Sequence, residues 1–189
     1  MSIHTVVNKE GIYFITFTCH NWLPLIELTK GYDFVYQFYS VLESQSHTII
    51  SYVIMPNHLH FLMHFGAGSL NTFIGNGKRF MAYEIIKRLK FKEKYDLLQQ
   101  LQIAVSNSDQ NCGKKYEVWI KGFDVKECRT ESFILQKLNY VHQNPVSGKW
   151  KLCKSAQDYL HSSCLFYFNG KYRFYKVSDY KDFTRRVPH

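Results

Sequence analysis

The chain has 189 residues, of which 46% are hydrophobic and 17% aromatic, so it suits one globular domain and is not a disordered protein. Its formal net charge is +9. A positive field of this size favours a polyanionic partner, most commonly nucleic acid, although a merely basic globular protein has the same balance.

The cysteines and the apolar segments indicate the compartment in which the protein is expected. The five cysteines are odd in number and form no CxxC pair, which argues against a disulfide framework or a zinc ribbon and fits a reducing, cytoplasmic location. No basic start followed by an apolar segment is present, so no signal peptide is predicted. The longest apolar stretch, near residues 48–55, is too short to span a bilayer, and no membrane association is expected.

In the first part of the chain, β-branched and aromatic runs alternate with one amphipathic segment. Pro24 and the pair Pro56-Asn57 mark turns, and the second of these predicts an antiparallel hairpin because the break between its strands is so short. The predicted elements are a strand at 11–20, a helix at 32–45, and strands at 47–55 and 58–65.

The second part is more polar. A helix is predicted at 69–90, with Ser69 as its cap and Gly75 and Gly77 loosening its middle. Residues 91–115 are predicted to be an irregular connection, residues 116–128 one or two short strands, and residues 130–144 a helix that Pro145 stops. This order of strands and helices predicts an α+β fold with a central antiparallel sheet.

Two histidines stand one residue apart in an otherwise apolar strand. Residues i and i+2 of a strand point to the same face, so His58 and His60 are expected to project together as a pair of metal ligands. The alternative is a polar strand face, or one buried histidine beside an exposed one. His64 follows the same alternation but lies further along the strand, where a structural or peripheral role is expected.

A second group of polar residues lies on the last predicted helix. Tyr140 and Asn144 are four residues apart and share a face. A tyrosine hydroxyl can attack phosphorus, provided that a metal ion polarises the phosphate, and an asparagine oxygen is a suitable third metal ligand. The alternative is that Tyr140 packs in the core and that Asn144 with Pro145 only ends the helix.

Together, the stretches MPNHLHFLM (55–63) and YVHQNPVSGKW (140–150) resemble the HUH tyrosine transposases, and among them the REP-associated tyrosine transposases of bacteria. The HUH motif, histidine–bulky apolar residue–histidine, corresponds to His58-Leu59-His60, and the tyrosine of the family precedes its Asn-Pro by four residues, as Tyr140 does. The stretches at 11–22 and 116–130 are similar to the segments of the family at these places, and residues 159–167 loosely so. The likeness spans most of residues 5–168 and is weakest across 91–115.

The resemblance implies a ferredoxin-like (RRM-like) fold and a metal-dependent enzyme that nicks and rejoins single-stranded DNA beside hairpins. Tyr140 would be the nucleophile, and His58, His60 and Asn144 would hold Mg²⁺ or Mn²⁺. The catalytic domain would span residues 1–150, and residues 151–189 would be a tail that contacts DNA or packs on the domain. The resemblance leaves monomer and homodimer open.

Basic residues are predicted to contact the DNA backbone, although a solvated charged face explains those of the helix at 69–90 equally well. The family often carries a basic residue after its NPV motif, where this chain has Ser147, so that contact is expected to be missing or to move to Lys149 or Lys151. The predicted DNA contacts are Lys78, Arg79, Lys87, Arg88, Lys149 and Lys151.

Two other functions compete with the transposase. A hairpin-binding protein without catalysis would keep the same fold but would not need the histidines, the tyrosine and the asparagine together. A phosphodiesterase with paired H-x-T/S motifs would need two copies, and only His161-Ser162-Ser163 fits that pattern.

Overall fold

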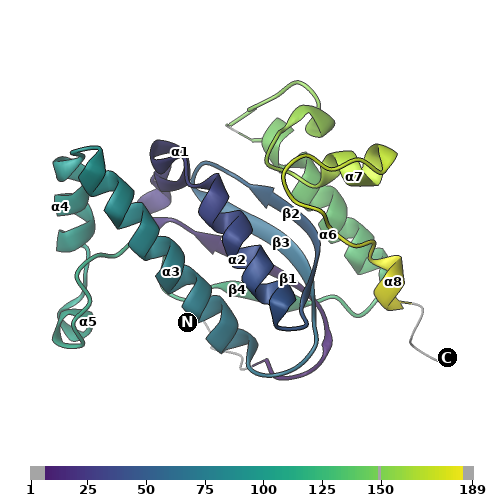
Figure 1. The fold of residues 1–189 in the computed structure, drawn as a ribbon, viewed down its shortest axis with the longest axis horizontal. Helices are drawn as coiled ribbons and strands as arrows, with labels where there is room; N and C mark the ends of the chain where they lie inside the picture. The colour runs from purple at the N-terminus through teal and green to yellow at the C-terminus, as the bar shows by residue number, and fades with distance from the viewer. Residues whose placement is uncertain (1–6, 149, 185–189) are drawn as a thin grey trace.

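A computed structural model describes residues 7–148 and 150–184 (Figure 1). Its elements follow the predicted order of strands and helices, with additional short helices. In chain order they are β1 Gly11–Thr18, α1 Leu25–Thr29, α2 Tyr32–Ser44, β2 Thr48–Ile54, β3 His58–Phe65, α3 Leu70–Phe91, α4 Tyr95–Ile103, α5 Asn107–Asn111, β4 Asp124–Glu127, α6 Glu131–Gln143, α7 Cys164–Asn169 and α8 Lys181–Thr184, with 3₁₀ turns at His20–Trp22, Asn144–Val146 and Ala156–Asp158.

The strands form one antiparallel sheet in the order β2-β3-β1-β4. With α2 between β1 and β2 and α3 between β3 and β4, this is the β-α-β-β-α-β connection of the ferredoxin-like fold. The α+β prediction is confirmed. In the central pair, His58 stands opposite Thr18 of β1, and His60 opposite Thr16.

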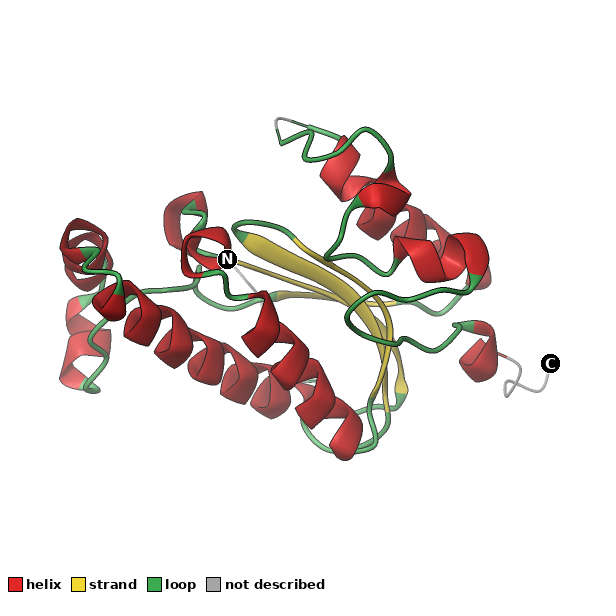
Figure 2. Cartoon of the chain, turned by 45° about the horizontal axis from the view of Figure 1, so that its top comes forward, coloured by secondary structure: helices red, strands yellow, loops and turns green. Residues whose placement is uncertain are grey.

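Helices cover both faces of the sheet. Figures 1 and 2 show α2 and α3 on one face and α6 on the other. The alternation of side chains along β3 explains this arrangement, because Leu59 and Phe61 belong to the core on the α2–α3 side while Leu62 belongs to the core under α6. The two histidines of the HxH motif have the same parity as Leu62, so they face α6.

The helix α3 is continuous through both of its predicted weak points. A Cβ atom on Gly77 would lie 2.1 Å from the Phe38 ring of α2, so the absence of a side chain allows the two helices to approach closely. Gly77 therefore serves packing rather than loosening the helix. Ser69 caps α3 as predicted, because its side chain accepts a hydrogen bond from the Thr72 amide.

The segment at 91–115 differs from the prediction of an irregular connection, because it contains α4 and α5. Leu98 and Leu101 are buried three residues apart on one face of α4, and Val105, just beyond the end of that helix, is buried as well. The glutamines between them dilute the apolar pattern along the chain, which is why the sequence alone did not show the helix.

The described part of the tail packs along the edge strand β2. The Ile54 amide donates to the carbonyl of His161 at 2.9 Å, and the Tyr159 hydroxyl donates to the carbonyl of Ile54 at 2.8 Å. Ser163 meets His142 of α6 at 3.1 Å between Oγ and Nε2, so the tail also holds α6 in place. Among the described residues, no helix combines the length and the apolar character that crossing a bilayer requires.

Candidate active site

The two histidines of β3 lie side by side under α6. Both are 6% exposed, and their ring centroids are 4.7 Å apart. The strand's period of two sets this pair, as the sequence predicts. Phe14 of β1 stacks on the His60 ring at 5.6 Å, which fixes that ring from the neighbouring strand.

The helix α6 brings a phenol and an amide to this pair within the same chain. The Thr130 side chain caps its first turn by accepting from the Phe133 amide. Near its other end, the ring centroid of Tyr140 lies 5.0 Å from that of His60. Asn144 Oδ1 lies 3.2 Å from His58 Nε2. The four residues predicted for the site therefore converge, although 80 residues of chain separate His60 from Tyr140.

Hydrogen bonds fix which nitrogen of His58 carries its proton. The Asn57 amide Nδ2 donates to the Trp22 carbonyl at 2.9 Å, which orients Asn57 so that its Oδ1 faces His58 Nδ1 at 2.7 Å. The Nδ1 proton of the neutral ring is thus donated to Asn57, and Nε2 keeps its lone pair. That lone pair faces the Oδ1 oxygen of Asn144, so the two atoms offer lone pairs to a cation rather than a hydrogen bond to each other.

The second imidazole is also held through its Nδ1, which lies 2.7 Å from the Thr16 hydroxyl on β1. When His60 Nδ1 donates to Thr16, its Nε2 is left with a lone pair, as metal ligation requires. In that tautomer, Thr16 and Asn57 leave both Nε2 atoms with a lone pair that a metal ion can accept.

This donor set fits a divalent ion. His58 Nε2 and Asn144 Oδ1 are 3.2 Å apart, close to the separation of about 3.0 Å between neighbouring ligands of an octahedral ion with bonds of about 2.1 Å. Two imidazoles and an amide oxygen leave further positions for phosphate oxygens and water. Within the described ranges, no group of three or more His, Cys, Asp and Glu side chains is arranged to hold a metal, so the set needs Asn144.

The electrostatics of the pair also suit ligation. Burial lowers the pKa of His58 to about 4, against a smaller opposing effect of the Asn144 side chain, whose oxygen favours a proton on the ring. Burial also lowers the pKa of His60 to about 3, assisted by the charges of His58 and Lys137. Both rings are therefore neutral at physiological pH, which is the form that binds a metal.

We expect Mn²⁺ affinity to change less than about twofold between pH 7.5 and 5.5, because neither imidazole gains a proton in that window. Two imidazoles with ordinary pKa values near 6.5 would instead lose roughly 100-fold. Isothermal titration calorimetry at the two pH values measures this difference, and a hundredfold loss at pH 5.5 would contradict the burial argument.

Two exposed or half-buried side chains complete the surroundings. The ring of Trp22 is 53% exposed and meets the His58 ring edge-to-face at 5.7 Å. Lys137, one turn before Tyr140 on α6, places its ammonium 5.6 Å from the Tyr140 ring centroid. The sequence alone does not predict Trp22 or Lys137 near the site, nor the roles of Asn57 and Thr16. For Lys137, the spacing of three residues from Tyr140 is a signal that the sequence contains.

The predicted DNA contacts on α3 lie on the opposite face of the sheet from α6, the helix that carries Tyr140 (Figures 1 and 2). The Lys78 ammonium donates to the carbonyls of Ile120 and Gly122. Arg88 forms a bidentate pair with Asp33 at 2.6 and 2.7 Å. These two side chains have partners within the protein, and their contact with DNA stays a prediction.

The remaining predicted contacts differ in position. Arg79 and Lys87 are on α3, and Lys87 lies 3.5 Å from Glu84. Lys149 lies outside the described residues. Lys151 is exposed and adjoins the carboxyl end of α6, since the next amide, that of Leu152, donates to the Pro145 carbonyl at 2.7 Å. Of the six, Lys151 is the described residue whose segment reaches the candidate site.

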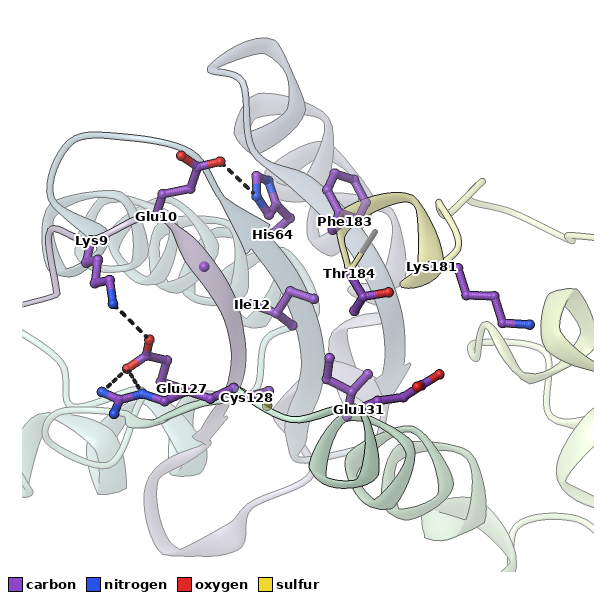
Figure 3. A pocket seen from close by; sticks show the side chains of 13 residues that line it. Lys9, Glu10, Ile12, His64, Glu127, Cys128, Glu131, Lys181, Phe183 and Thr184 are labelled. Atoms are coloured by element: carbon purple, nitrogen blue, oxygen red, sulfur yellow. Dashed lines mark hydrogen bonds and ion pairs between the residues drawn. The ribbon is translucent and has the colours of Figure 1, made fainter. Parts of the chain in front are cut away.

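A cleft of about 1230 Å³ opens on the same sheet face, toward the other end of β1 and β3 (Figure 3). Its floor includes Ile12 and His64, and its rim carries ion pairs such as Glu10 with His64 at 3.3 Å and Lys9 with Glu127 at 3.9 Å. None of the four candidate site residues lines it. The cleft is therefore adjacent to the site rather than part of it.

Comparison with known proteins supports the sequence resemblance at the level of fold. No protein-family model and no curated protein matches the chain. A solved structure of a REP-associated tyrosine transposase bound to a REP hairpin matches over 100% of both chains, with 18% identity and a TM-score of 0.59. A transposase candidate from Deinococcus radiodurans R1 matches 75% of this chain and 95% of its own, with 11% identity and a TM-score of 0.35, too low to add to the argument. The chain thus has the fold of the REP-associated enzyme.

Proposed function

We propose that the protein is a metal-dependent, single-strand DNA transposase that nicks and rejoins DNA through a 5′-phosphotyrosine intermediate, at hairpin ends. The observation that carries the proposal is the convergence of a half-exposed phenol with two buried neutral imidazoles and an amide oxygen. A module that only binds hairpins has no use for this set. The net charge of +9 and the shared fold with a hairpin-bound transposase support DNA as the substrate.

The site suits a substrate that arrives from solvent. Tyr140 is 47% exposed, while the histidines beneath it are almost fully covered. The phenol can therefore reach a phosphate on the surface, and the imidazoles stay fixed below. A divalent ion held by His58, His60 and Asn144, Mg²⁺ or Mn²⁺, would polarise that phosphate as a Lewis acid.

In the proposed reaction, the Tyr140 hydroxyl gives its proton to solvent and its oxygen bonds to phosphorus. The bond between phosphorus and the 3′ oxygen breaks, and that oxygen takes up a proton and leaves as a 3′-hydroxyl. The 5′ side stays attached to Tyr140 as a phosphodiester. Attack by another 3′-hydroxyl reverses these steps and releases the phenol, so rejoining needs no ATP.

The test is to incubate the protein with Mn²⁺ and a library of labelled DNA hairpins whose stems and single-stranded flanks are randomised. We expect a covalent protein–DNA complex that survives denaturing electrophoresis, with the DNA joined through its 5′ phosphate. Mass spectrometry of the digested complex should place the adduct on the peptide that contains Tyr140. Hairpin binding without any cleavage or adduct would instead identify a binding module.

A further inference from the structure

Lys137 occupies an unusual position beside the candidate nucleophile. Its ammonium nitrogen lies 4.8 Å from the ring centroid of Phe14, 5.1 Å from that of Phe133 and 5.6 Å from that of Tyr140. Three rings therefore hold the cation in one place and reduce the rotamer freedom that a surface lysine normally has. On α6, Lys137 lies about one turn before Tyr140, and Asn144 lies one turn after it.

The held ammonium has no protein partner that satisfies its hydrogen bonds. Across residues 7–148 and 150–184, no carboxylate pairs with Lys137 and no oxygen accepts a hydrogen bond from it. Other lysines are satisfied within the protein, as Lys114 is by Glu117 at 2.7 Å. Aromatic faces attract a cation but accept its N–H groups poorly, so three donors of Lys137 are available to a ligand.

The positive charge of Lys137 repels a metal ion at the proposed site unless an anion lies between the two cations. Lys137 and His60 contact the same two rings, those of Phe14 and Tyr140. A divalent ion on the His60 side would be repelled by the ammonium across a half-buried space. A phosphate that meets both cations converts this repulsion into two attractions.

Resting on the function proposed above, we infer that Lys137 binds a non-bridging oxygen of the scissile phosphate and stabilises the negative charge that develops there during attack by Tyr140. This assigns to α6 a phosphate contact that the chain does not supply at Ser147, after its NPV motif. Lys137 would thus act on one side of Tyr140, and the metal ligand Asn144 on the other.

The first test compares Lys137→Met with Lys115→Met, which removes an equal charge from an exposed position on the loop between α5 and β4. Methionine keeps the length and packing of the lysine stem without its charge. We expect Lys137→Met to slow adduct formation roughly 10- to 100-fold, the usual effect of losing a charge-assisted hydrogen bond, with a melting temperature lowered only slightly by the loss of the ring contacts. Lys137→Arg should restore much of the rate, and Lys115→Met should resemble the wild type.

The second test asks whether Lys137 acts on the phosphate itself. Hairpin DNA with an uncharged methylphosphonate at the scissile position lacks the charge that Lys137 is inferred to bind. With Tyr140→Phe protein, which cannot react, adding Lys137→Met should weaken binding of the native hairpin but leave binding of the methylphosphonate hairpin unchanged. Equal losses on both hairpins would overturn the inference.

The third measurement follows Mn²⁺ by electron paramagnetic resonance. Without DNA, Lys137→Met should bind Mn²⁺ as tightly as the wild type or more tightly, because a repelling charge is gone. With hairpin DNA bound, the same variant should bind Mn²⁺ more weakly. A change in Mn²⁺ affinity of the same sign with and without DNA would overturn the inference, as would a wild-type rate of adduct formation in Lys137→Met. Failure of the wild type to form any adduct would overturn the proposed function instead.

Discussion

The Tyr140→Phe variant is expected to bind hairpin DNA as the wild type does and to form no covalent adduct. The ring of Tyr140 meets His60 at 5.0 Å and Phe14 at 5.8 Å between centroids, and phenylalanine preserves both contacts. Within the described part of the chain, the hydroxyl makes no hydrogen bond, so its removal leaves no buried partner unsatisfied. The substitution therefore removes the nucleophile alone.

Loss of a nucleophile costs on the order of 10⁴-fold or more in rate, which denaturing electrophoresis with labelled DNA detects as the disappearance of the adduct. Tyr83→Phe is the matched control, because Tyr83 is 68% exposed on α3, on the opposite face of the sheet. It should form the adduct at the wild-type rate. An adduct that persists in Tyr140→Phe would assign the nucleophile to another residue.

Local periodicity predicts the parts of this site that lie within one element. The alternation of a strand places His58 and His60 on one face, and the turn of a helix places Tyr140 and Asn144 on one face; the structure shows both. Which face of the sheet α6 covers depends on the topology of the whole chain. The meeting of the histidine pair with Tyr140 and Asn144 is predicted by the family resemblance and not by any pattern within 55–65 or 130–144.

The contacts that support the site depend on tertiary structure and were not predictable from spacing. The sequence pattern places Asn57 in a turn, and in the structure it also joins the Trp22 carbonyl to His58 Nδ1. Trp22 has a positive φ of 56°, a backbone conformation that a sequence pattern does not predict for tryptophan.

The position of the basic residues is likewise not predictable from the sequence. Composition counts the basic residues but does not say which are satisfied internally. Lys78 lies against backbone carbonyls and Arg88 against Asp33, whereas Lys137, which no sequence motif singles out, has its ammonium beside Tyr140. The sequence of α3 is rich in basic residues. The helix nevertheless lies on the face of the sheet opposite α6, which separates it from the candidate site.

The second large effect is expected from His58→Ala, which should lower cleavage on the order of 10³-fold and Mn²⁺ affinity by roughly 10- to 100-fold. The substitution removes one of two imidazole donors, the one whose Nε2 lies 3.2 Å from Asn144 Oδ1. It also leaves the buried Oδ1 of Asn57 without its donor, at a cost of about 1–3 kcal/mol in the free energy of unfolding. Thermal unfolding must therefore be measured beside activity.

His64→Ala is the matched control for this substitution, because it removes an imidazole from the same strand and the same face. His64 stacks on Phe183 at 4.4 Å and meets Glu10 at 3.3 Å, at the far end of β3 from Asn144. If His58 acts as a metal ligand, His58→Ala loses Mn²⁺ affinity and is partly restored by excess Mn²⁺, while His64→Ala changes stability alone. Equal Mn²⁺ affinity in the two variants would show that the HxH pair of this chain is a structural feature of the sheet and that the phosphate must be activated elsewhere.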